Sequence, residues 1–243
     1  YIVKSVVKLV RAKGKRLRVL WRAVINPVLL GGVLLFVFVA NAGVNYYRMP
    51  FEQAIGLAVT KSSVQELKAL CYTLAEDATQ LRTRLQEDEN GVMRLSQSDD
   101  ATAQRAKEAY DKMQALYPTL TAGYGPTKQL WLSHYLSYTK ITGFFFPFTV
   151  EANVNNDVPD YSIPSTMCHE LSHMRGYMRE EEANFIAYLV CMSSGDQELM
   201  YSGTMLAFVY AGNALSEVSR ADYTDVFRTL GEGVQRDIKA NSE

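Results

Sequence analysis

The most informative stretch of this chain runs from Thr166 to Leu189. Its sequence is T-M-C-H-E-L-S-H-M-R-G-Y-M-R-E-E-E-A-N-F-I-A-Y-L. It contains His169-Glu170-Leu171-Ser172-His173, which places two histidines four residues apart. On a helix, residues i and i+4 lie on one face, so both imidazoles can bind a single Zn²⁺. Glu170 between them can act as general base on a water molecule. The alternative is two ordinary helix histidines beside a surface glutamate, but the chain has only three histidines and two fall here.

A zinc site needs a third protein ligand, and an acidic cluster follows the motif closely. Gly176 can end the first helix in a left-handed turn, and an apolar run from Phe185 to Met192 indicates a second helix. The cluster Glu180-Glu181-Glu182 therefore lies at the start of that second helix, where carboxylates also stabilise the helix itself. Three carboxylates exceed what a helix start requires, so we expect one of them to bind the metal.

The spacing of Glu180 and Asn184 resembles the Glu-x-x-x-Asp pattern of gluzincin peptidases. In those enzymes the Glu binds zinc and the Asp supports a ligand histidine. The resemblance implies Glu180 as the third ligand and Asn184 as a residue that supports a histidine, with Glu182 as the second choice and Glu181 as the least favoured. The short turn also resembles the metzincin pattern, but Arg179 occupies the place of its third histidine and does not bind zinc.

Several segments resemble an uncharacterised bacterial family, domain of unknown function 3810. They are G-Y-M-R-E-E-E-A-N-F-I-A-Y-L from Gly176, I-T-G-F-F-F-P-F-T-V-E-A-N-V-N from Ile141, and the downstream Y-S-G and A-G-N-A-L. The resemblance covers most of the chain from about Ala23 onward. Members are membrane-anchored and carry H-E-L-x-H. The resemblance therefore implies a membrane-tethered zinc metallopeptidase, and it implies no particular substrate.

Charge is distributed unevenly along the chain. Residues 1–50 contain nine basic residues and no acidic one, whereas residues 51–243 contain 16 basic and 26 acidic residues. An acidic body argues against nucleic acid as a partner. The three cysteines, Cys71, Cys168 and Cys191, can form at most one disulfide, so this is not a disulfide-stabilised scaffold, and we expect Cys168 to be a core residue.

The N-terminal region combines a basic segment with a long apolar run. Residues 23–44 carry no charge over 22 residues, which is long enough to span a bilayer. The basic residues of segment 1–22 predict a cytoplasmic location for that segment and an extracytoplasmic location for the rest of the chain, in a bacterial cell membrane. A cleaved signal peptide is the alternative, with a shorter apolar core. The sequence begins with Tyr1 rather than Met, so we expect it to be a fragment or a trimmed form of a longer chain.

The fold class that we predict is a helix-dominated α+β protein. After the transmembrane helix at 23–44, residues 45–122 are interpreted as a helical hairpin, because two helical patterns within 62–117 flank Asn90-Gly91. Residues 123–243 are interpreted as a zincin-like catalytic domain with a small sheet. Its last segment, Asp222 to Ala240, reads as one amphipathic helix.

Residues Phe148 to Asn155 alternate between apolar and polar side chains, which predicts a half-buried strand. Pro147 favours an edge position for this strand. An edge strand just upstream of the active-site helix is a natural place for an extended peptide. We therefore expect the polar face to contact substrate: Thr149, Glu151, Asn153 and Asn155. The alternative is an ordinary sheet edge with solvated polar groups.

These observations together predict a zinc-dependent peptidase that acts on a peptide or protein substrate at the outer membrane surface. His169, His173 and Glu180 would hold Zn²⁺, Glu170 would move the proton, and Tyr201 is a candidate donor to the oxyanion. Two alternatives stay open at this stage. One is an intramembrane protease, which the charged residues after Gly176 disfavour. The other is a binding module that holds zinc without turnover.

Overall fold

The computed structural model describes residues 16–130 and 133–241. Contacts divide the chain into two units, Tyr1–Val44 with Pro147–Thr149 and Asn45–Phe146 with Val150–Glu243. Most of the basic segment predicted at residues 1–22 lies outside the described residues. Each unit is described here by itself.

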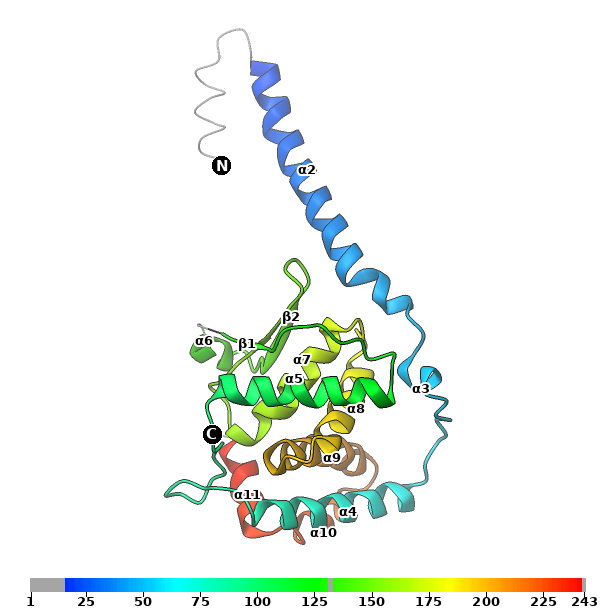
Figure 1. Cartoon of the computed structure of the whole chain (residues 1–243), viewed down its shortest axis with the longest axis vertical. Helices are drawn as coiled ribbons and strands as arrows, with labels where there is room; N and C mark the ends of the chain where they lie inside the picture. Colours follow the sequence, from blue (N-terminus) through cyan, green and yellow to red (C-terminus); the bar gives the residue numbers. More distant parts are fainter. Residues whose placement is uncertain (1–15, 131–132, 242–243) are drawn as a thin grey trace. The chain divides into compact units, whose positions relative to one another are not determined.

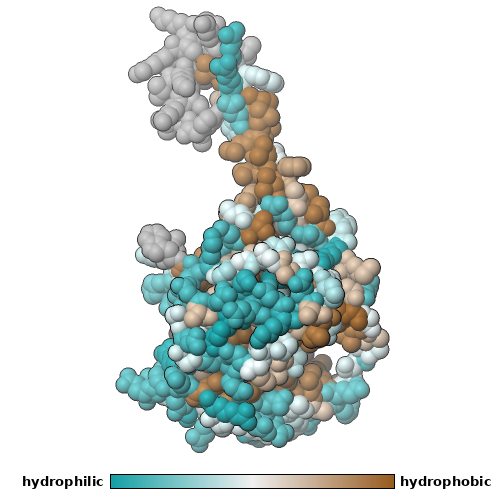
Figure 2. Space-filling view, in the orientation of Figure 1, coloured by the Kyte–Doolittle hydropathy of each residue, from teal (hydrophilic) through white to brown (hydrophobic). Residues whose placement is uncertain are grey.

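The first unit is built on helix α2 (Arg16–Asn41), which is followed by the 3-10 turn η1 (Gly43–Tyr47). The segment Arg18–Tyr47 is the one described helix long and apolar enough to cross a membrane, by length and composition. A signal sequence has the same properties. Its large apolar side chains are exposed along its length (Figure 2). An uncovered apolar surface on a helix of this length fits a membrane anchor, as predicted for residues 23–44, and a signal sequence equally.

The second unit is built around three consecutive helices, α7 (Ile163–Met174), α8 (Glu180–Ser193) and α9 (Gln197–Val218). Helix α8 packs against both α7 and α9. On one side α5 (Asp99–Leu116) covers α7 and α8, and on the other α4 (Val64–Arg82) covers α9 (Figure 1). Two apolar cores result, one between α5, α7 and α8 and one between α4 and α9.

The helical hairpin predicted for residues 45–122 does not form. Both helices are present and begin as capped helices, with Ser63 capping α4 and Ser98 capping α5. However, α4 packs on α9 and α5 packs on α7 and α8, so each belongs to a different core. Each amphipathic stripe is buried by a helix far along the sequence, and the second unit runs through the expected boundary at residue 122.

The sheet is small and mixed, with strands β1 (Lys128–Gln129), β2 (Gly143–Phe146) and β3 (Glu151–Val154). The strand order is β1-β3-β2, so β3 is central. It pairs in parallel with β1 and antiparallel with β2. The prediction of an edge strand at Phe148–Asn155 is therefore wrong. Pro147 lies in the turn before the strand, and Val150 in that turn has a positive φ of 56°.

Short helices complete the second unit. They are α3 (Phe51–Ala54), α6 (Ser133–Ser137), the 3-10 turn η2 (Asp160–Ser162), α10 (Arg220–Phe227) and α11 (Glu232–Ala240). The single helix expected at Asp222–Ala240 is thus two helices. Gly231 begins the second of them, and a Cβ there would lie 2.8 Å from Thr79 Cγ2 on α4, so the break lets the backbone approach α4 closely.

Candidate metal centre

Helix α7 ends where the sequence predicts it to end. Gly176 has a φ of +86°, its N–H donates to the His173 carbonyl, and the Tyr177 N–H donates to the Ser172 carbonyl. Glycine adopts this left-handed conformation without the steric cost that a Cβ would bring. The turn brings the chain back so that Glu180, the first residue of α8, faces the last turn of α7.

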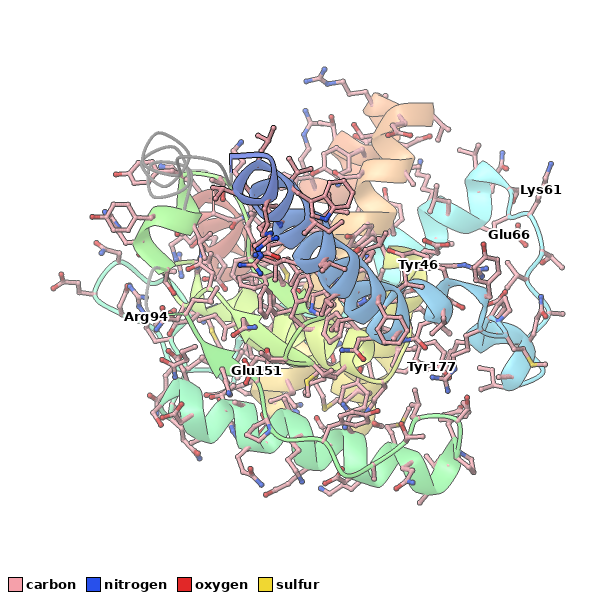
Figure 3. All side chains as sticks on the ribbon, turned by 90° about the horizontal axis from the view of Figure 1, so that it is seen from above. Tyr46, Lys61, Glu66, Arg94, Glu151 and Tyr177 are labelled. Atoms are coloured by element: carbon pink, nitrogen blue, oxygen red, sulfur yellow. The ribbon has the colours of Figure 1, made fainter. Side chains whose placement is uncertain are left out.

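The two histidines of the motif lie side by side on α7. Their Nε2 atoms are 3.0 Å apart. Each Nδ1 donates a hydrogen bond, from His169 to Asn184 Oδ1 at 2.8 Å and from His173 to the Tyr177 carbonyl at 2.7 Å. A histidine whose Nδ1 carries the proton presents a bare Nε2 to a metal, and such partners fix the ring orientation. Asn184 therefore holds His169 as predicted, and the Tyr177 carbonyl does the same for His173 (Tyr177 is labelled in Figure 3).

Glu180 completes the cluster, which we call the His-His-Glu cluster (His169, His173 and Glu180). Its Oε2 lies 3.2 Å from His169 Nε2 and its Oε1 lies 3.6 Å from His173 Nε2. Glu182, the second choice from the sequence, is engaged elsewhere, because its Oε1 accepts the Phe51 N–H at 2.8 Å. The Glu180 side chain is 73% exposed, so the cluster has one side open to solvent.

The electrostatics of the cluster favour a cation. Burial and then the neighbouring His173 lower the pKa of His169, which disfavours a proton on its imidazole. Two imidazole nitrogens and a carboxylate therefore converge, and none of them is paired with a lysine or arginine side chain among the described residues. All candidate ligand atoms lie within 4.8 Å of one another, and these three residues could hold a metal ion. Donors bound tetrahedrally to zinc lie roughly 3.3 Å apart, and the three observed separations bracket that value.

Glu170 lies on the neighbouring face of α7 and is only 4% exposed. Burial first, and then the charge of Glu180, raise the pKa of Glu170 to about 8. Its Oε2 has no hydrogen-bond partner among the residues that the structure describes. A Cβ on Gly143 of β2 would lie 2.7 Å from Glu170 Oε1, so the backbone of β2 passes directly over this carboxyl group.

Tyr201 does not fit the role of an oxyanion donor. Its hydroxyl donates to Asp237 Oδ2 at 2.6 Å within the core between α4 and α9, and Tyr201 itself is fully buried. Burial and the neighbouring Asp237 raise the pKa of this hydroxyl well above its usual range, so it stays protonated and donates to Asp237. The prediction failed because α9 is apolar on most sides, and its sequence does not tell which face meets α7.

The polar residues expected on a substrate strand also have other partners. Glu151 forms an ion pair with Lys128, and Asn155 Nδ2 donates to Ser137 Oγ and to the Ile141 carbonyl, each at 3.0 Å (Glu151 is labelled in Figure 3). Asn153 Nδ2 donates to the Glu151 carbonyl, and Thr149 lies in the turn before β3. Glu151, Asn153 and Asn155 thus support the sheet and its flanking loop.

The close approach of β2 to Glu170 is not evident from the apolar pattern of its sequence. A glycine at the start of an apolar strand often marks a close approach of the backbone to another group, and Gly143 in G-F-F-F could have been read in this way. The third histidine, His134, lies on α6 beside Asp157 and is exposed, as a histidine without a metal role would be.

The chain belongs to a protein family of unknown function, DUF3810, whose family model matches residues 1–243. No curated protein and no solved structure matches the chain. The family agrees with the resemblance noted in the sequence and brings no activity with it.

Proposed function

We propose that this member of the family is a membrane-anchored zinc metallopeptidase that hydrolyses peptide bonds on the outer side of the membrane. The observation that carries the proposal is the meeting of two bare imidazole nitrogens and the Glu180 carboxylate next to the buried Glu170. Three protein ligands with an open side are typical of catalytic zinc sites, whereas structural sites are closed by a fourth protein ligand.

Each residue has a defined task in this proposal. His169, His173 and Glu180 hold the zinc ion, and Asn184 and the Tyr177 carbonyl keep the two rings in place. A zinc ion held by these residues would supply Lewis acidity for the scissile carbonyl and for a water molecule near neutral pH. The charge of a zinc ion held beside it would favour the ionised form of Glu170. That carboxylate would accept a proton from the attacking water and pass it to the nitrogen of the leaving amine, so the amide becomes a carboxylic acid and an amine.

The substrate binds along β2 rather than along β3. In an antiparallel pair, hydrogen-bonded and non-hydrogen-bonded residues alternate. The Asn155 N–H donates to the Thr142 carbonyl at 2.8 Å, and Gly143 and Phe145 are opposite Val154 and Ala152. The backbone N–H and C=O groups of Gly143 and Phe145 therefore point away from β3. An extended peptide that pairs with this edge passes close to Glu170, because Gly143 lies against that carboxyl group.

The anchor in this proposal is the apolar helix of the first unit, with the basic residues 1–22 in the cytoplasm. The native cysteines are all buried, so a single engineered Asn90→Cys can report the topology. A membrane-impermeant maleimide should label Asn90→Cys in intact cells and leave a Ser5→Cys control unlabelled. Labelling of the control alone would reverse the topology.

The activity is tested with Glu170→Gln, because glutamine cannot accept the proton. The variant should keep zinc and lose peptide hydrolysis by about 10²–10⁴-fold. Glu89→Gln, at an exposed glutamate, is the control and should match the wild type. Wild-type hydrolysis by Glu170→Gln would remove Glu170 from the mechanism. Zinc binding without hydrolysis of any peptide in a broad library would favour the binding module instead.

A further inference from the structure

An apolar groove begins at the candidate metal centre and runs between α4, α8 and α9. Its volume is about 660 Å³. Its walls are mostly large apolar and aromatic side chains, namely Leu70, Leu74, Phe185, Tyr188, Leu206 and Tyr210. The groove has the size and lining that are typical of sites for organic ligands.

The polar end of the groove belongs to the metal centre itself. Glu180 and Asn184, one turn apart on α8, line the groove and also contact His169. A molecule held at the metal centre can therefore extend directly into the groove. From Glu180 to Tyr188 the helix rises about 12 Å, the length of roughly three extended residues of a peptide.

The rim of the groove leaves large apolar side chains in contact with solvent. Leu70 is 49% exposed, Phe185 36% and Tyr210 55%. Apolar residues that gather around a hollow in this way are typical of a binding site. No lysine or arginine lines the groove among the described residues, whereas Glu180 and Glu181 lie at its entrance. An acidic ligand would be repelled there.

We propose that this groove binds apolar side chains of the substrate next to the cleaved bond, so the enzyme prefers uncharged, hydrophobic peptides. The inference rests on the proposed peptidase function and names the substrate class of that site. The hydroxyl groups of Tyr188 and Tyr210 have no hydrogen-bond partner among the described residues. They can bind main-chain groups of a peptide, which a lipid acyl chain does not offer.

The test compares the affinities of several hydroxamates for the zinc-loaded chain (residues 1–243) in nanodiscs. Acetohydroxamate reports the metal centre alone. Succinyl hydroxamates coupled to Leu-Phe-amide or to Ser-Gly-amide add an apolar or a polar extension, and octanohydroxamate adds an acyl chain. We expect the Leu-Phe compound to bind roughly tenfold or more tightly than acetohydroxamate, and the Ser-Gly compound to show no gain.

Two pairs of variants test whether the tighter binding of the Leu-Phe compound, relative to acetohydroxamate, arises in the groove. Leu70→Glu puts a charge on its wall, and Tyr72→Glu makes the same change on α4 outside the groove. Ala207→Trp fills the groove, and Val209→Trp is its control on α9. The groove variants should lose the gain from Leu-Phe and keep acetohydroxamate binding, while both controls keep the gain.

The outcomes separate the two proposals. Binding of acetohydroxamate with no gain from Leu-Phe, or a gain that both groove variants keep, would overturn the groove and leave the metal centre standing. A larger gain for octanohydroxamate would assign the groove to an acyl chain and overturn the peptide assignment. No binding of any hydroxamate to the zinc-treated protein would overturn the metal centre, and the groove proposal with it.

Discussion

Two polar clusters lie in the second unit, one fully buried and one open to solvent on one side, and they differ in how their charges are balanced. The Asp237 cluster comprises Arg82, Tyr201, Asp237 and the N–H of Met93. The Asp237 carboxylate accepts from Arg82 Nε at 2.7 Å, the Tyr201 hydroxyl at 2.6 Å and the Met93 N–H at 2.8 Å. Every charge there meets an opposite charge or a donor. The His-His-Glu cluster instead brings three electron-pair donors together, and no lysine or arginine side chain pairs with them among the described residues.

The difference separates polar groups that support the fold from polar groups that are arranged for a ligand. A buried charge is tolerated when hydrogen bonds and an opposite charge compensate it. In the Asp237 cluster, the members of the cluster provide both for one another. In the His-His-Glu cluster, hydrogen bonds to Asn184 and Tyr177 hold the rings in an orientation that leaves both Nε2 atoms bare. These hydrogen bonds direct the lone pairs of both rings at one point, which would stabilise a cation bound at the proposed site.

The largest effect that we expect is on zinc affinity. His173→Ala removes one of three ligands and should weaken zinc binding on the order of 1,000-fold or more, beyond the loss seen when only a residue behind a ligand is removed. The melting temperature of the metal-free protein should barely change. A chelator competition titration measures the affinity, with His134→Ala at the exposed third histidine as control. Equal losses in both variants would remove His173 from the site.

The next largest effect is on stability, in the other cluster. Asp237→Ala leaves Arg82 buried without its main partner and should lower the free energy of unfolding by about 3–5 kcal/mol. Zinc affinity of the folded fraction should stay unchanged, because Asp237 has no contact with the His-His-Glu cluster. Urea unfolding gives the stability, and the same chelator titration gives the affinity. If Asp237→Ala instead weakened zinc binding and left the free energy of unfolding unchanged, the Asp237 cluster would be the one arranged for a ligand.

A smaller effect is expected behind the metal ligands. Asn184→Ala removes the acceptor for His169 Nδ1 and should weaken zinc binding about 10–100-fold. Asn213→Ala on α9, where the side chain is exposed, is the control. If Asn184→Ala binds zinc like the wild type, packing alone holds the ring of His169 in place. The hydrogen bond to Asn184 would then be no evidence that the cluster is arranged for a cation.

The smallest effect concerns pH and the metal-free protein. The pKa of Glu170 rises from its ordinary 4.5 to about 8 on folding, so between these values the folded state binds more protons than the unfolded state. The stability from this group is therefore present below pH 4.5 and is lost as the pH rises towards 8. Relative to Glu170→Gln, the wild type should lose up to about 1.4 kcal/mol per pH unit between pH 6 and 7. Parallel stability curves for the two proteins would contradict the buried position of Glu170.

The local part of the site could be predicted from the sequence, and the long-range part could not. Helical spacing alone places His169 and His173 on one face, and the φ preference of glycine places the turn at Gly176. Glu180 and Asn184 follow from the resemblance to the Glu-x-x-x-Asp pattern of gluzincin peptidases. All these residues lie within about 16 positions, where the helix geometry leaves few alternatives.

The predictions that were wrong concern places where segments distant in the sequence pack together. β3 became central because the two-residue strand β1 pairs with its second edge, and so short a strand leaves no pattern in the sequence. The stripes of α4 and α5 were visible, but their partners, α9 and α7, lie far along the chain. The same limit explains Tyr201, because nothing in α9 shows that its hydroxyl meets Asp237 of α11.

X-ray absorption at the zinc edge tests the central claim most directly, because it reports the atoms bound to the metal. For the zinc-loaded chain (residues 1–243) we predict two imidazole nitrogens at about 2.0–2.1 Å from the zinc ion, oxygen in the remaining positions and no sulfur. His169→Ala should remove one imidazole from the signal. A sulfur shell at about 2.3 Å, or a spectrum that His169→Ala leaves unchanged, would contradict the assignment of zinc to His169, His173 and Glu180.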